Sequence, residues 1–147
     1  MIKLDDGLWI GLAVGPEYSN LSASGIDAVL NTAQDLQSVI GWDDGIDYMQ
    51  VGLIDGPGNT LSAHYAAVLA LAALLKRHEN VLVCCHEGGR SLAVAIMYLQ
   101  TVFAHGWDVW INLLRERVDT DLPTPNSAHK VAFGRMNWDL LKRAMED

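Results

Sequence analysis

One segment constrains the fold more than any other: an apolar run that passes through two adjacent cysteines and a glycine-bearing loop into a helix. The residues Val81–Cys84 are all apolar, which is typical of a strand buried on both faces of a sheet. Arg90–Phe103 has the composition of a helix, and Gly106 closes it. A strand followed at once by a helix is the repeating unit of parallel α/β sheets.

The rest of the chain continues this alternation of short apolar runs and longer helical ones. We expect strands at Gly7–Leu12, Asp27–Asn31 and Tyr48–Ile54, a helical turn at Leu21–Ile26, a loop at Asp55–Asn59, and helices at Ser62–Arg77, Trp107–Arg117 and Asn126–Met145. Such a pattern predicts an α/β fold around a central, mostly parallel sheet flanked by helices. The 147 residues suit one domain, residues 1–147, that buries about two-thirds of its surface on folding.

Composition excludes several classes of protein. Half of the residues are hydrophobic and 19% are charged, so the chain is not disordered as a whole. The net charge of −8 disfavours nucleic acids and anionic membranes as partners, because both require a basic surface. The longest apolar run, Tyr65–Leu75, has 11 residues, too few to span a bilayer. The oligomeric state is left open.

The two cysteines, Cys84 and Cys85, are neighbours and cannot form a disulfide framework. Free thiols suit a reducing compartment, and the early acidic residues of the N-terminus do not resemble a signal peptide. We therefore expect a cytoplasmic protein. Consecutive Cys-Cys-His has poor geometry for a zinc ion, so no metal is expected. The other histidines, including His64 and His129, are expected to be surface or partly buried residues.

The segment from Val81 to Ser91 has a specific chemistry. Loop amides and a helix N-terminus form a cradle for an anion, and the same field favours a thiolate. A guanidinium at the helix start, here Arg90, can bind two oxygens of a tetrahedral oxyanion. A thiolate beneath a bound phosphate ester is a nucleophile directed at phosphorus.

This segment resembles the signature of the small, atypical dual-specificity phosphatases, within the cysteine-dependent protein tyrosine phosphatase superfamily. The signature is Cys, five residues, Arg, then Ser or Thr; Cys84 and Arg90 have that spacing, and Ser91 follows. The similarity covers nearly the whole chain in the same order: Gly7–Gly11, Gly25–Asn31, Asp55, Asn59–Tyr65, Arg90–Leu99 and Pro125-Asn126.

The resemblance implies a phosphotyrosine phosphatase-like fold and hydrolysis of phosphomonoesters through a phosphocysteine, without a cofactor. The substrate would be a phosphorylated protein or a small phosphomonoester. In a protein, the default target would be phosphotyrosine, together with phosphoserine or phosphothreonine. One cysteine would attack phosphorus, Arg90 would bind the phosphoryl oxygens, and Asp55 would protonate the leaving oxygen. Ser91 would help the sulfur to depart, and Asn31 would orient the loop. The loop residues that would bind substrate are His86, Glu87, Gly88 and Gly89.

The sequence departs from the usual family pattern, His-Cys-x-x-Gly-x-x-Arg, in a way that leaves both cysteines as candidates. Counted from Cys84, the glycine position is Glu87, whose carboxylate would repel phosphate inside the cradle. Counted from Cys85, Gly88 falls on the glycine, but only four residues precede Arg90. If Cys84 is the nucleophile, the loop keeps its usual length and the strand before it is shifted by one residue. Such a shift costs little in a strand that is apolar on both faces, and this argument favours Cys84.

Two other functions remain open because of this departure. A phosphate-binding module with little turnover, a pseudophosphatase, would retain the fold and bind the anion without efficient catalysis. Sulfur transfer is the third possibility, since the four-residue gap from Cys85 to Arg90 is similar to the active loop of rhodanese-like proteins. The surrounding chain resembles phosphatases and argues against sulfur transfer.

Overall fold

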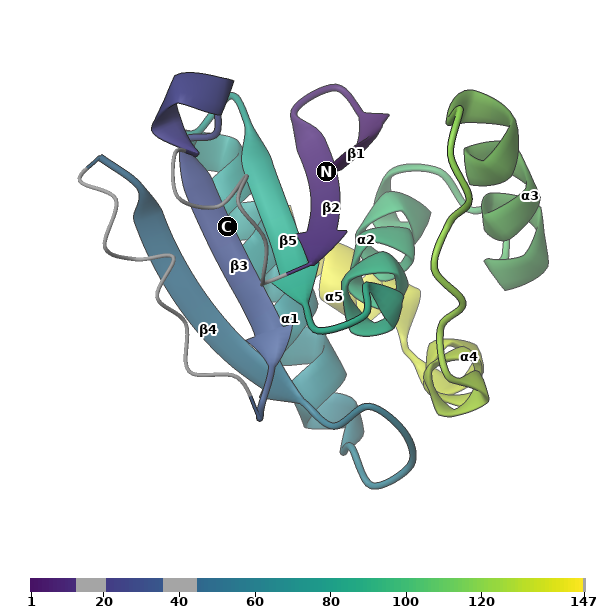
Figure 1. The fold of residues 1–147 in the computed structure, drawn as a ribbon. Helices are drawn as coiled ribbons and strands as arrows, with labels where there is room; N and C mark the ends of the chain where they lie inside the picture. The colour runs from purple at the N-terminus through teal and green to yellow at the C-terminus, as the bar shows by residue number, and fades with distance from the viewer. Residues whose placement is uncertain (13–20, 36–44, 147) are drawn as a thin grey trace.

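A single five-stranded sheet forms the centre of the computed structural model, which describes residues 1–12, 21–35 and 45–146 (Figure 1). The strands are β1 (Ile2–Asp5), β2 (Leu8–Leu12), β3 (Ala28–Ala33), β4 (Asp47–Leu53) and β5 (Val81–Cys85). Their order across the sheet is β1-β2-β5-β3-β4, and every pairing except β1 with β2 is parallel. This confirms the expected α/β fold with a mostly parallel sheet.

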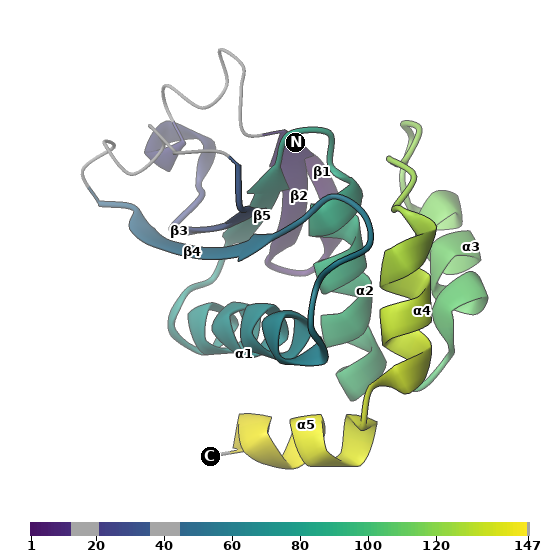
Figure 2. The ribbon, with the colours of Figure 1, turned by 90° about the horizontal axis from the view of Figure 1, so that it is seen from below.

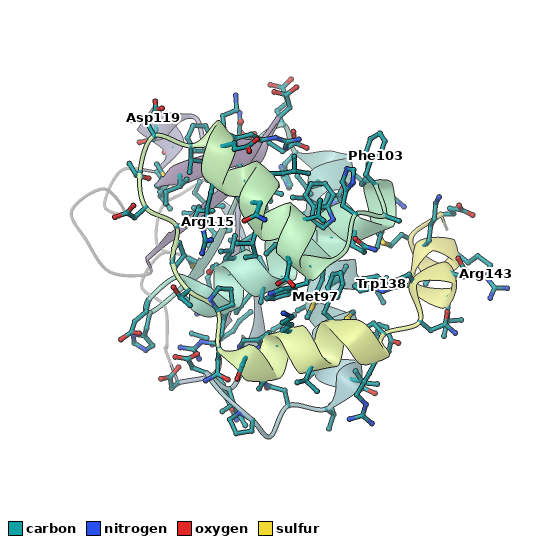
Figure 3. All side chains as sticks on the ribbon, turned by 90° about the vertical axis from the view of Figure 1, so that its right-hand side faces the viewer. Met97, Phe103, Arg115, Asp119, Trp138 and Arg143 are labelled. Carbon is teal, nitrogen blue, oxygen red and sulfur yellow. The ribbon has the colours of Figure 1, made fainter. Side chains whose placement is uncertain are left out.

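Five α-helices pack around this sheet within the described residues. They are α1 (Leu61–Arg77), α2 (Gly89–Val102), α3 (Trp107–Arg117), α4 (Ser127–Arg135) and α5 (Trp138–Glu146), with a short 3₁₀ turn, η2, at Ser22–Ser24. Figure 2 shows α1 and α2 on the same face of the sheet, with α4 alongside α2 and α5 outside α1. In Figure 3, Met97 of α2 lies in the space between α3 and α4, where it is fully buried. None of the helices described is long and apolar enough to cross a membrane.

The sheet separates two hydrophobic clusters, and β5 contributes to both. Alternate side chains of a strand point to opposite faces. Val81 and Val83 belong to the large core that contains the residues of α1 and α2, whereas Leu82 and Cys84 belong to a smaller cluster on the other face. By the same alternation, Cys85 returns to the face that carries the helices. The two thiols therefore lie on opposite sides of the sheet.

One expectation about the elements was wrong, and one strand was missed. The predicted helix at 126–145 is two helices, because Asn137 starts a new one: its Oδ1 accepts a hydrogen bond from Leu140 N at 3.0 Å, and its own N–H donates to Tyr65 Oη at 2.7 Å. Strand β1 was not predicted. It has four residues, of which only Leu4 is fully buried, so its apolar pattern is weak.

Candidate active site

The loop that follows β5 is held in place by its two glycines. Residues 85–90, called here the Cys85 loop, run from the end of β5 into the first turn of α2. Gly88 has φ +89°, and a Cβ there would lie 2.9 Å from Pro123 Cγ; a Cβ on Gly89 would lie 3.1 Å from Thr124 O. The segment before α4 therefore packs directly on the Cys85 loop, and only glycine fits at position 88.

The two cysteines have different surroundings. Cys85 Sγ accepts a hydrogen bond from Gly88 N at 3.1 Å, beside the N-terminal end of α2. An N–H donor and a helix N-terminus both favour a thiolate. Cys84 lies in the apolar cluster on the other face, where burial, and to a lesser degree the neighbouring Cys85, raises its pKa to about 12. Cys84 is therefore a protonated core thiol at neutral pH.

Arg90, the last residue of the Cys85 loop, is buried and already has two partners. Its side chain is 4% exposed, and its Nη1 donates to Leu53 O at 2.8 Å and to Asp35 Oδ1 at 2.9 Å. The hydrogen bond from Arg90 lowers the pKa of the largely exposed Asp35. The other oxygen of Asp35 lies 3.5 Å from His86 Nε2. Asp35 therefore connects the end of β3 to the Cys85 loop.

Asp35 was not predicted as a site residue, although a signal for it existed. Asp35 follows β3 at the edge where β5 ends in Cys85, since the two strands are parallel neighbours. Polar side chains that follow parallel strands meet at the carboxyl edge of the sheet. The same reasoning applies to Thr32, whose hydroxyl donates to Cys84 O at 3.0 Å and ties β3 to β5.

Asp55 lies on an exposed loop that is held in shape by hydrogen bonds between its own residues. Residues 54–60, called here the Asp55 loop, follow β4. Asn59 Oδ1 accepts from Ile54 N at 2.8 Å, and its Nδ2 donates to Ile54 O at 2.8 Å and to Gly56 O at 3.3 Å. A Cβ on Gly56 would lie 3.8 Å from Asn126 Nδ2. The expected loop is confirmed, and it lies next to the start of α4.

Three further predicted site residues have distinct places. Ser91 Oγ is buried in the first turn of α2 and makes no hydrogen bond within the described residues. Asn31 Nδ2 donates to Tyr48 Oη at 3.1 Å and its Oδ1 accepts from Ala33 N at 2.9 Å, so these bonds fix the end of β3. Glu87 is exposed and lines a cavity of about 360 Å³ whose lining includes neither Cys85 nor Arg90. Glu87 thus lines a cavity that Arg90 does not line.

The expectation for two of the histidines was wrong. His64 and His129 are only 1% and 0% exposed; His64 contacts Thr60 at the end of the Asp55 loop and lies against His129. Nothing in their sequence spacing indicates this contact, because it depends on how α4 packs against α1. Elsewhere among the described ranges, no three His, Cys, Asp or Glu side chains are grouped as metal ligands would be.

Comparison with known proteins identifies the fold through structure alone. No protein-family model matches the chain, and no curated protein sequence matches it. The crystal structure of DUSP15 superposes with a TM-score of 0.79 at 19% identity, over 98% of this chain and 93% of that one. A mouse putative dual specificity phosphatase, complexed with zinc tungstate, gives 0.78 at 20% identity, over 98% and 90%. The Yvh1 phosphatase domain from Chaetomium thermophilum gives 0.70 at 17% identity, over 95% and 94%.

These similarities extend over nearly the full length of each chain. They agree with the five-stranded, mostly parallel sheet and its flanking helices. The chain therefore has the fold of the small dual-specificity phosphatases.

Proposed function

We propose that the protein is a phosphomonoester hydrolase of the dual-specificity phosphatase type, which acts through a phosphocysteine on a phosphorylated protein or a small phosphomonoester. The observation that carries this proposal is the hydrogen bond from Gly88 N–H to Cys85 Sγ at the start of α2, two residues before the buried Arg90. A sulfur anion is favoured there, and so is the phosphate that it would attack. The free thiols fit a reducing compartment, and we propose a cytoplasmic enzyme.

We favour Cys85 over Cys84 as the nucleophile, although the strand-slip argument from the sequence pointed to Cys84. The thiol of Cys84 is buried in an apolar cluster on the far face, and burial raises its pKa to about 12. A thiol that holds its proton at neutral pH is a poor nucleophile. Cys85 accepts an amide hydrogen bond on the face that carries α2.

The reaction proceeds in two balanced steps. The Cys85 thiolate attacks phosphorus, an S–P bond forms, and the P–O bond to the leaving group breaks as Asp55 gives its proton to the leaving oxygen. Arg90 and the amides of His86, Glu87, Gly88 and Gly89 bind the phosphoryl oxygens, where charge is held through the transition state.

Water then attacks the phosphocysteine and gives a proton to the Asp55 carboxylate, and the electrons of the S–P bond return to sulfur. Ser91 Oγ, buried without a partner among the described residues, donates to the departing thiolate. Asn31, fixed at the end of β3, supports the strand next to Cys84.

A specific observation favours a second candidate, a phosphate-binding pseudophosphatase. Only four residues separate Cys85 from Arg90, which makes the cradle smaller than that of the usual pattern. Arg90 Nη1 is also engaged by Leu53 O and by the carboxylate of Asp35, so an incoming phosphate must compete with Asp35. A smaller cradle would slow turnover, and competition with Asp35 would weaken binding of the phosphate.

A series of variants separates these functions. Hydrolysis of an aryl phosphate is measured for the wild type, Cys85→Ser, Cys84→Ser and Asp55→Asn, with vanadate binding measured in parallel. We expect Cys85→Ser to abolish turnover and Cys84→Ser to retain it. An inert wild type that binds vanadate would establish the pseudophosphatase instead. Formation of thiocyanate from thiosulfate and cyanide would establish sulfur transfer.

A further inference from the structure

A cavity of about 580 Å³ lies between the Asp55 loop and α4, and the proposed reaction gives it no role. The loop and the helix lie side by side in both ribbon views (Figure 1, Figure 2). Residues 56–61 form one wall, together with His64 of α1. Residues at helical spacing on α4 form the other wall: Ala128, Val131, Ala132 and Arg135. The cavity therefore lies along one face of α4.

The cavity begins close to the side chain that we propose to bind phosphate. Arg90 Nη1 donates to Leu53 O at 2.8 Å, and Gly56, the first residue of the lining, is three positions further along the chain. Three residues of extended chain span at most about 11 Å, so this end of the cavity lies within that distance of Leu53. Asn59, also in the lining, bonds to both the N–H and the carbonyl of Ile54 and holds this part of the loop in place. A peptide whose phosphate is bound at Arg90 can therefore place its neighbouring residues in the cavity.

Arg135 gives the cavity its positive charge. Among the described residues that line it, Arg135 is the one with a full charge at pH 7, because burial lowers the pKa of His64 and keeps that ring neutral. Arg135 is exposed, and it makes no hydrogen bond or ion pair within the described residues. The net charge of −8 repels an acidic ligand from the molecule as a whole. A carboxylate would therefore be attracted locally, by this unpaired guanidinium.

The other part of the site is apolar and open to solvent. Val131, in the wall on α4, is 62% exposed. Ile54, on the loop, is 42% exposed, and a Cβ on the lining residue Gly58 would lie 3.5 Å from its Cδ1. Large apolar side chains that are exposed beside a cavity are typical of a surface that binds another molecule. The site thus combines an apolar surface with one cation.

We propose that this cavity binds an acidic segment of a phosphorylated protein substrate, with a carboxylate of the segment paired to Arg135 and an apolar side chain packed on Val131. The inference rests on the proposed function and narrows its substrate to a phosphoprotein. Ala128 to Arg135 covers about 10 Å of helix, in addition to the 11 Å or less from Leu53 to Gly56. An extended peptide rises about 3.3 Å per residue, so the acidic residue lies within about six positions of the phosphorylated one.

Peptides with a non-hydrolysable phosphotyrosine analogue test the proposal without relying on turnover. Three peptides share a central difluorophosphonomethyl-phenylalanine. The first has glutamate at the third to sixth positions on its N-terminal side, the second has glutamate at these positions on its C-terminal side, and the third has glutamine at all of them. We expect one of the glutamate peptides to bind the wild type about threefold to fivefold more tightly than the glutamine peptide at low salt, with a smaller advantage at high salt.

Variants of the wall on α4 attribute this preference to Arg135. Arg135→Gln should remove it, and Arg135→Glu should bind a lysine version of the preferred peptide more tightly than the glutamate version. Val131→Glu keeps Arg135 but places a carboxylate four residues before it on the same helix face, so the preference should also fall. The matched control is Lys142→Gln, which removes an exposed cation of α5 outside the cavity lining and should keep the preference of the wild type.

The cavity and the proposed function fail by different results. Equal binding of the three peptides, or a preference that survives in Arg135→Gln, overturns the role of the cavity, whatever the rate of hydrolysis. A preference that depends on Arg135, in a protein that does not hydrolyse aryl phosphates, overturns the proposed hydrolase and supports the cavity. Hydrolysis of an aryl phosphate by a protein that binds none of the three peptides overturns the cavity alone.

Discussion

Arg90 donates from Nη1 to Asp35 Oδ1 at 2.9 Å, so the guanidinium that we propose to bind phosphate is already paired with a carboxylate. Arg90 is almost fully buried, whereas the side chain of Asp35 is 65% exposed. The pair therefore has one fixed member and one that solvent can reach. An anion that enters the Cys85 loop can displace the exposed carboxylate and keep the buried guanidinium in place.

Removal of the Asp35 charge should tighten oxyanion binding. Asp35→Asn keeps the size of the side chain, and we expect tungstate affinity to rise about threefold to fivefold at low salt, with a smaller gain at high salt because exposed charges are screened. Asp6→Asn is the control, since Asp6 is exposed and its only ion pair in the described structure is with Lys3 at 3.9 Å. Equal or weaker binding by Asp35→Asn would show that Asp35 positions Arg90 and does not compete with the anion.

Cys84 should make the fold sensitive to alkali. Its pKa is about 12 in the folded protein against an ordinary value of 9.0, so the folded state retains a proton that the unfolded state loses. The free energy of unfolding should therefore fall as the pH rises from about 9 toward 12. Cys84→Ala should reduce this slope and leave turnover near that of the wild type. Urea unfolding at several pH values measures the effect, and an unchanged slope in Cys84→Ala contradicts the assignment.

The buried imidazoles should make the fold sensitive to acid. Burial lowers the pKa of His64 and lowers that of His129 to about 4, against an ordinary 6.5, so the unfolded state binds more protons in this window. The contribution of the two imidazoles to the free energy of unfolding is fully present above about pH 6.5 and is lost as the pH drops toward 4. His129→Gln should flatten this dependence in the same urea series, whereas His105→Gln should leave it as in the wild type. A wild type equally stable at pH 4.5 and pH 7 would contradict the buried neutral pair.

Gly88 should be the least replaceable glycine of the Cys85 loop. Gly88→Ala combines a φ of +89° with a Cβ 2.9 Å from Pro123 Cγ, and we expect it to destabilise the fold by about 1–3 kcal/mol and to weaken tungstate binding. Gly25→Ala is the matched control: its φ is +87°, but a Cβ there meets nothing within 4 Å. If Gly88→Ala loses no more stability in urea unfolding than Gly25→Ala does, Pro123 moves aside without cost and the prediction is wrong.

The local patterns of the chain predicted most of the architecture. The apolar run at Val81–Cys84 and the helical composition of Ser62–Arg77 each depend on a few neighbouring residues, and both agree with the structure to within a residue. Cys84 and Cys85 could not be separated in this way, because a strand that is apolar on both faces does not show which face carries the helices. The two hydrophobic clusters supply that information.

Asp35 and the pair of His64 and His129 were missed for a different reason. The contact of Asp35 with Arg90 joins positions 55 residues apart, and the contact of His64 with His129 joins positions 65 apart. Such contacts depend on strand order and helix packing, which a single sequence specifies only through the complete fold. Strand order alone would have indicated Asp35. The histidine pair also requires the docking of α4 against α1.

The site of covalent phosphorylation tests the central claim most directly. The protein is mixed with an aryl phosphate, quenched in acid within the first turnover and digested, and the peptide that contains both cysteines is fragmented by mass spectrometry. We predict one phosphoryl group on the sulfur of Cys85 in the wild type and in Cys84→Ala, and none in Cys85→Ala. A phosphoryl group on Cys84, or turnover in the absence of any phosphocysteine, would contradict the account.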